Sequence, residues 1–153
     1  MKTNIAIEHL IKSRLNLVAL LEKHESKINT VPKNYNNSLF WNAAHCLVTM
    51  QLLCYKLSGV QMLVSDELVD LYRKGTKVEL GENKVSLKDL KEDLINTAEQ
   101  LKVDYEKGLF KSYDQYETSY GVQLNSIDDA ISFNNIHEGL HIGYMLSMVK
   151  SID

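Results

Sequence analysis

Residues 126–148 read SIDDAISFNNIHEGLHIGYMLSM, and this stretch decides the predicted fold. Its apolar side chains recur at steps of three and four residues, the period of one face of an α-helix. Ser126, followed three residues later by Asp129, forms a capping box, so the helix is predicted to begin there. Three polar residues lie on the same predicted buried face: Asn134, His137 and His141. Because a buried polar group without a partner costs roughly 1–3 kcal/mol, these side chains need partners.

Three further segments have the same helical period. Their apolar positions fall within residues 7–21, about 39–57, and 87–105. The first helix is predicted to end near Ile28, and the second is apolar almost all round, which predicts the most buried helix. The third begins with a capping box at Ser86 and Asp89, and Gly108 supplies a stop.

Two long connections separate these four helices. The first contains residues 65–73, which are predicted to form a short extra helix. The second is rich in tyrosine, at Tyr113, Tyr116 and Tyr120. Long connections of this kind occur in helical bundles whose chain crosses from one end to the other. We therefore predict an all-α four-helix bundle with long crossover-type connections, in a single domain spanning residues 1–153.

The composition excludes several classes of function. The chain has 153 residues, 44% hydrophobic and 24% charged, which is ordinary for one soluble globular domain. Its formal net charge is -3, and it contains no run of like charges. Neither nucleic acid nor a membrane surface is therefore a predicted partner. No apolar stretch approaches the roughly 20 residues needed to span a bilayer.

The predicted location is the cytoplasm. The apolar run at residues 15–21 is followed by no small-residue cleavage site, so it is not a signal peptide. Cys46 and Cys54 are eight positions apart. On one helix they would be about 12 Å apart, beyond the roughly 7 Å limit for a disulfide. They are predicted to be reduced and buried, as expected in a reducing compartment.

A metal site is predicted where the last helix meets the second. His137 and His141 are four residues apart, so their imidazoles lie one above the other on one helix face. His45, in the apolar second helix, supplies a third nitrogen. Three imidazoles around a tetrahedral metal leave one position open for water or substrate. The alternative is a face that borders solvent or a wet groove, with each histidine bonded to a carbonyl or water.

Five neighbouring side chains are predicted to line a pocket at this site or to support the ligands. They are Trp41, Asn42, Asn134, Tyr120 and Tyr144. Trp41 and Asn42 share a helical face with His45, so Asn42 would orient a ring or bind a ligand. The alternative is that Trp41 is core packing and Asn42 helps to cap the helix.

Residues 137–141 match the H-E-x-x-H pattern, which in metalloproteases combines two zinc ligands with a glutamate base. The match is weak evidence for proteolysis, because no histidine or glutamate follows His141 and no clear strand precedes the motif. Glu138 remains a candidate general base or hydrogen-bond acceptor beside the metal, or alternatively one end of a surface ion pair. Arg14 either points toward a pocket, pairs with an acid or covers apolar surface with its stem.

The chain resembles the DinB-like (DinB/YfiT) superfamily of metal-binding four-helix bundles. The resemblance is strongest in residues 39–45 and 126–143 and covers nearly the whole domain. Family members place one histidine on the second helix and an H-x-x-x-H pair on the last, which correspond to His45, His137 and His141. The resemblance implies a divalent metal ion, zinc or nickel, at the bottom of a cleft, and a homodimer.

Three functions are compatible with these observations. The leading hypothesis is a divalent-metal-dependent enzyme that transfers a low-molecular-weight thiol to a small electrophile, because the resemblance includes enzymes that use bacillithiol, mycothiol or glutathione. A metal held by neutral imidazoles keeps its full charge and lowers the pKa of a bound thiol or water. The second is a metal-dependent hydrolase of small esters or amides. The third is a non-catalytic stress-response bundle that binds metal or a small molecule.

Overall fold

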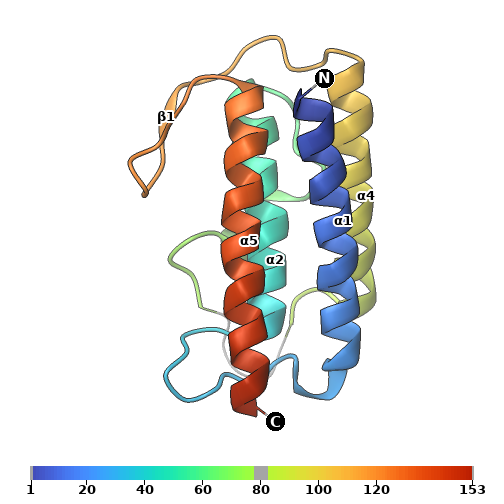
Figure 1. Cartoon of the computed structure of the whole chain (residues 1–153), viewed down its shortest axis with the longest axis vertical. Coiled ribbons are helices and arrows are strands. Elements are labelled where there is room, and N and C mark those ends of the chain that lie inside the picture. The colour runs from blue at the N-terminus through green and yellow to red at the C-terminus, as the bar shows by residue number, and fades with distance from the viewer. Residues whose placement is uncertain (1, 78–82, 153) are drawn as a thin grey trace.

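The structure, a computed structural model, describes residues 2–77 and 83–152. These residues form five α-helices and one short antiparallel hairpin. The elements are α1 Lys2–Lys23, α2 Leu39–Met50, α3 Asp66–Tyr72, α4 Leu87–Glu106, β1 Tyr116–Glu117, β2 Gln123–Leu124 and α5 Ile127–Ile152. Four long helices lie side by side (Figure 1), and the predicted all-α fold is confirmed.

Each of the four long helices packs against at least two other helices. α1 lies against α4 and α5, and α2 lies against α5 and α3. The colours of Figure 1 show that α1 and α5 run in one direction and α2 and α4 in the other. The connection between α2 and α4 contains α3, the short helix predicted at residues 65–73. Its cap is Ser65, whose hydroxyl accepts from the Leu68 amide at 3.2 Å.

The capping boxes begin both later helices where the sequence predicts. The Ser86 hydroxyl accepts from the Asp89 amide at 3.0 Å at the start of α4. The Ser126 hydroxyl accepts from the Asp129 amide at 3.2 Å at the start of α5. Each cap satisfies a backbone N–H that has no partner inside the helix, which stabilises the helix by roughly 1 kcal/mol.

The second helix changes its winding after its third turn. α2 ends at Met50 and continues as a π-helical turn, Gln51–Tyr55, and a 3₁₀ turn, Lys56–Ser58. The predicted extent to about Leu57 is therefore right, but the sequence pattern did not predict the change of winding. The buried Gln51 side chain accepts from the Leu63 amide at 2.7 Å and so ties this turn to the following loop. π-Helical turns occur frequently at functional sites.

The core lies between the long helices and is built from the predicted stripes. α2 is buried almost all round, as expected, and Cys46 and Cys54 within this segment are buried and free. α1 ends at Lys23, before the predicted end near Ile28, and a 3₁₀ turn, Glu25–Lys27, follows it. Within the described ranges, no helix is both long enough and apolar enough to cross a membrane.

The structure contains one short hairpin that the sequence pattern did not predict. The sequence shows no clear strand before the H-E-x-x-H motif, yet β1 and β2 pair there in a two-residue ladder, Tyr116 opposite Leu124 and Glu117 opposite Gln123. The turn between them requires Gly121, whose φ of 71° favours glycine. Two residues per strand are too few to produce the alternation of apolar and polar residues from which a strand is predicted.

Candidate metal centre

Three histidines from two helices converge between α2 and α5. His45 comes from α2, and His137 and His141 come from successive turns of α5. One nitrogen from each ring lies within 4.8 Å of the others. The ring centroids are 4.5 Å apart for His137 and His141, 4.8 Å for His45 and His141, and 5.1 Å for His45 and His137. The structure therefore brings the three predicted ligands together.

Hydrogen bonds determine the tautomer of two of these rings. Nδ1 of His45 lies 2.8 Å from the Tyr72 carbonyl, which only accepts, so this nitrogen carries the proton. Nδ1 of His141 lies 2.8 Å from Oδ1 of Asn42, whose amide Nδ2 donates to the Ser38 carbonyl. In both rings Nε2 keeps a lone pair for a ligand. Histidines that bind metals usually have such a partner on the second nitrogen.

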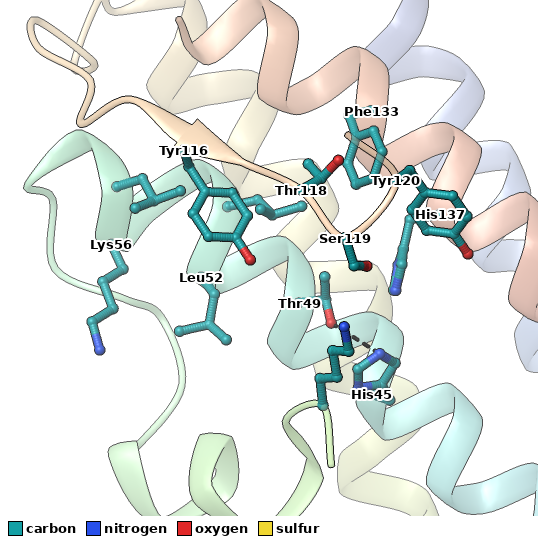
Figure 2. Close-up of a pocket in the computed structure, with 13 residues that line it drawn as sticks. His45, Thr49, Leu52, Lys56, Tyr116, Thr118, Ser119, Tyr120, Phe133 and His137 are labelled. Atoms are coloured by element: carbon teal, nitrogen blue, oxygen red, sulfur yellow. Dashed lines mark hydrogen bonds between the residues drawn. The ribbon is translucent and has the colours of Figure 1, made fainter. Parts of the chain in front are cut away.

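The remaining contacts of the rings leave room for a ligand. Nε2 of His45 lies 3.4 Å from the Thr49 hydroxyl, at the long limit of a hydrogen bond (Figure 2). Nδ1 of His137 is buried and has no hydrogen-bond partner among the described residues. A buried nitrogen left in this way costs roughly 1–3 kcal/mol, because it loses its bond to water and gains nothing in return.

The environment keeps all three rings neutral. Burial, the neighbouring rings of His141 and His45, and the charge of Arg14 together lower the pKa of His137 to about 3, because desolvation and repulsion between like charges disfavour the protonated ring. Burial and His45 likewise lower the pKa of His141 to about 4. Burial also lowers the pKa of His45. Metal coordination requires the unprotonated imidazole, so the donor set and its protonation fit a divalent ion such as zinc or nickel.

Behind the histidines, Arg14 and Glu138 form a fully buried ion pair. Nε and Nη2 of Arg14 donate to the two oxygens of Glu138, each at 2.6 Å, and Nη2 also reaches the Cys46 carbonyl at 3.1 Å. Nδ2 of Asn134 donates to the same carboxylate at 2.9 Å. Of the three alternatives for Arg14, the structure shows the pairing with an acid, while a surface ion pair for Glu138 is wrong because Glu138 is 0% exposed.

These contacts assign Glu138 and Asn134 to the core of the bundle. Both oxygens of Glu138 accept from Arg14, so the carboxylate is an ion-pair partner, and the geometry does not support the candidate general-base role. Asn134 was predicted beside the metal, but its Nδ2 donates to Glu138, and its Oδ1 has no hydrogen-bond partner among the described residues. A residue one position after His137 is rotated by about 100° around the helix, which turns Glu138 toward α1.

Two cavities adjoin the histidines. The first, which we call the apolar cavity, has a volume of about 290 Å³ and contains His45 and His137 in its lining (Figure 2). Its other lining residues are Thr49, Leu52, Leu53, Lys56, Leu57, Lys74, Tyr116, Thr118, Ser119, Tyr120 and Phe133. The π-helical turn supplies one wall, and the β1–β2 hairpin supplies another.

The second cavity, which we call the polar cavity, has a volume of about 360 Å³ and contains His141 in its lining. Its other lining residues are Asn36, Asn37, Trp41, Asn42, Tyr120, Leu140 and Tyr144. Tyr120 borders both cavities. The predicted pocket residues Trp41, Asn42, Tyr120 and Tyr144 therefore all lie at a cavity beside the histidines.

The aromatic side chains near the histidines differ in what they contact. The Trp41 ring stacks on His45 with centroids 4.7 Å apart and planes 8° apart, and its Nε1 donates to the Thr76 hydroxyl at 3.2 Å. Of the predicted tyrosine-rich segment, Tyr116 and Tyr120 line the apolar cavity. Tyr113 instead packs against the core.

Several lining residues were not identified from the sequence. Phe133 precedes His137 by four positions, so helical spacing was a usable signal for it. Lys74 and Ser119 lie in irregular segments, where no period relates them to the histidines. Their positions depend on how two loops fold back onto α2 and α5, which is tertiary information.

Comparison with known proteins assigns the family. The family model described as the DinB superfamily matches residues 9–145, which include all three histidines. The chain belongs to the DinB superfamily. A search among curated proteins finds no significant match. The resemblance identified from the sequence is thereby confirmed, and its three histidine positions are the ones that converge in this DinB-superfamily fold.

Proposed function

We propose that this DinB-superfamily protein is a divalent-metal-dependent enzyme that transfers a low-molecular-weight thiol to a small electrophile. His45, His137 and His141 would hold the metal, zinc or nickel. The observation that carries the proposal is the convergence of three neutral imidazoles, one with a buried unpaired nitrogen, beside two cavities. When bound, a divalent metal supplies positive charge that lowers the pKa of a thiol or water.

The protein's own residues perform the binding and orientation. The Tyr72 carbonyl and the Asn42 amide hold two rings with Nε2 unprotonated, and Trp41 restricts the rotation of His45 by stacking. Such partners hold ligands in place before the metal binds. Leu52 and Phe133 line the same cavity as His45 and His137, and an apolar lining of this kind strengthens electrostatic interactions.

The two cavities support transfer in preference to hydrolysis. A transferase joins two organic molecules. The apolar cavity reaches the histidine cluster at His45 and His137, and the polar cavity reaches it at His141. A hydrolase needs one organic substrate and water, so it leaves one cavity without an occupant. Hydrolysis of small esters or amides is therefore the second candidate.

The first test is the metal content of tag-free protein by mass spectrometry. We expect about one zinc or nickel per chain in the wild type and in His9→Ala, an exposed histidine outside the cluster, and loss of metal in His45→Ala and His137→Ala. Wild-type protein that stays metal-free after reconstitution, or metal that persists in both cluster variants, contradicts the proposal.

The second test separates the two reactions. Metal-loaded protein is incubated with an aryl halide and a panel of thiols, and separately with small esters and amides. The proposal predicts thiol conjugation that requires both the metal and the thiol, and that is lost in His137→Ala. Ester hydrolysis without any added thiol, together with no conjugation, would establish the hydrolase instead.

A further inference from the structure

The apolar cavity combines a hydrophobic wall with positive charge. We propose that it binds acceptor molecules that have an apolar body and an anionic group such as a carboxylate, and that Lys74 recognises the anion. The inference rests on the proposed function, because it names the class of substrate that the same site would take. It is nevertheless carried by separate residues, since none of the three histidines supplies the charge.

The wall of the cavity selects an apolar body. Leu52, Leu57 and Phe133 line it together with the rings of Tyr116 and Tyr120. Ligand sites of this composition draw most of their affinity from buried apolar area, and a few polar groups fix the orientation. A volume of about 290 Å³ suits a small molecule with a single ring or a short alkyl chain.

The charge of the lining is positive and has no counter-charge. Two lysines, Lys56 and Lys74, line the cavity, and no aspartate or glutamate is found in its lining among the described residues. In the part of the chain that the structure describes, neither lysine forms an ion pair. The whole chain has a net charge of -3, so this concentration of cations is local. A cleft of one sign beside apolar walls attracts ligands of the opposite sign.

The loop that carries Lys74 is fixed at the histidine end of the cavity by two hydrogen bonds, one on each side of the lysine. On one side the Tyr72 carbonyl accepts from Nδ1 of His45 at 2.8 Å. On the other side the Thr76 hydroxyl accepts from Nε1 of Trp41 at 3.2 Å. The loop is thus fixed to α2 at two points, so Lys74, although exposed, is carried by a fixed segment.

The cavity lining agrees with this position. Lys74 and His45 line the same cavity, and the carbonyl of Tyr72, two positions before Lys74, bonds the His45 ring. Lys56 lies at the other end of the cavity, beyond Tyr116 and away from the histidines (Figure 2). An anion at Lys74 therefore lies beside the candidate metal centre, and the apolar body extends along Leu52 toward Lys56.

The test compares an acid with its uncharged amide of the same shape. 3-Phenylpropionate and 3-phenylpropionamide are titrated into metal-loaded full-length protein by calorimetry, with fluorescence of Trp41, the only tryptophan, as a second readout. We expect the acid to bind about fivefold or more tightly than the amide, as for a charge-assisted contact at a partly solvated site. Lys74→Met should remove this preference, because it keeps the apolar stem and deletes the charge.

The control is Lys77→Met, an exposed lysine three positions further along that does not line the cavity. It should keep the wild-type preference. Equal binding of acid and amide to the wild type, no binding of either, or a preference that survives in Lys74→Met overturns the inference. The last result would mean that the metal attracts the carboxylate.

Metal content is measured in the same samples. A full complement of metal without acid preference refutes the role of Lys74 and leaves the proposed function intact. The opposite result is a protein that takes up no metal but still prefers the acid through Lys74. That result supports the anion site and refutes the metal-dependent enzyme.

Discussion

His137 and Glu138 are neighbours in the sequence, yet they belong to two different polar regions of the bundle. Glu138 is fully buried, and its carboxylate accepts three hydrogen bonds from Arg14 and Asn134. His137 is half-buried, and its buried Nδ1 has no partner among the described residues. The carboxylate of Glu138 is satisfied by the protein alone, and Nδ1 of His137 is not. Oδ1 of Asn134, beside the ion pair, also has no partner among the described residues.

The difference shows how to separate a structural polar group from a ligand-binding one. Both regions interrupt apolar stripes, so hydropathy does not distinguish them. The number of satisfied hydrogen bonds does, because a buried polar group persists only if something compensates it. Glu138 is compensated by Arg14 of α1. In the histidine cluster, by contrast, neutral ring nitrogens lie within 4.8 Å of one another.

The largest effect should come from breaking the ion pair. Glu138→Gln keeps the size of the side chain and leaves Arg14 as an uncompensated buried charge, which costs about 3–5 kcal/mol. Urea unfolding of the metal-free protein should show this loss. Arg14→Met combined with Glu138→Leu should be far more stable than Glu138→Gln, because no charge is left buried. A double variant that is as unstable as the single one would contradict this account.

Removing a partner of a candidate ligand should have the next largest effect. Asn42→Ala deletes the acceptor that orients His141 and should weaken metal affinity by about 10–100-fold. Asn42→Asp is the matched control, because it keeps an oxygen acceptor for Nδ1. Competition with a chromophoric chelator measures both. Unchanged affinity in Asn42→Ala would show that the amide has no part in orienting the ring.

Lowering the pH should destabilise the metal-free protein through its buried histidines. The pKa values of His137 and His141 are about 3 and about 4 in the folded chain and near 6.5 when unfolded. The unfolded chain therefore binds more protons below pH 6.5, and stability is lost as the pH falls from 6.5 toward 4. The loss should be on the order of 1–2 kcal/mol per ring at pH 5, as measured by urea unfolding. His137→Leu should reduce the dependence of the free energy of unfolding on pH. An unchanged dependence in this variant would contradict the prediction.

The smallest effect should come from His137→Leu at pH 8 without metal. The substitution removes the unpaired nitrogen and fills the same space with apolar atoms, so the free energy of unfolding should change by less than about 1 kcal/mol. The neighbouring Glu138→Gln is the comparison in the same assay. If both cost the same, the two regions do not differ as described.

The sequence predicted what depends on local spacing. The caps at Ser86 and Ser126 and the buried stripes follow from neighbouring residues, and the structure reproduces them. The convergence of His45 with the distant pair was predicted from apolar context and family resemblance, and the three rings do meet.

What the sequence missed depends on which faces meet in three dimensions. The direction of Glu138 is known only once α1 brings Arg14 against α5. The π-helical turn after Met50 leaves the apolar pattern unchanged, so no period reveals it. Lys74 reaches the cavity because hydrogen bonds from Trp41 and His45 hold its loop, and neither bond is visible in a linear pattern.

X-ray absorption spectroscopy of the zinc- or nickel-loaded protein shows directly whether the three histidines bind the metal. The account predicts a first shell that contains three imidazole nitrogens, at about 2.0–2.1 Å for zinc, and no protein sulfur. Addition of the substrate thiol should introduce one sulfur at about 2.3 Å, and His137→Ala should lose the imidazole shell. A shell of oxygen atoms without imidazole, or one that is unchanged in His137→Ala, would contradict the proposed centre.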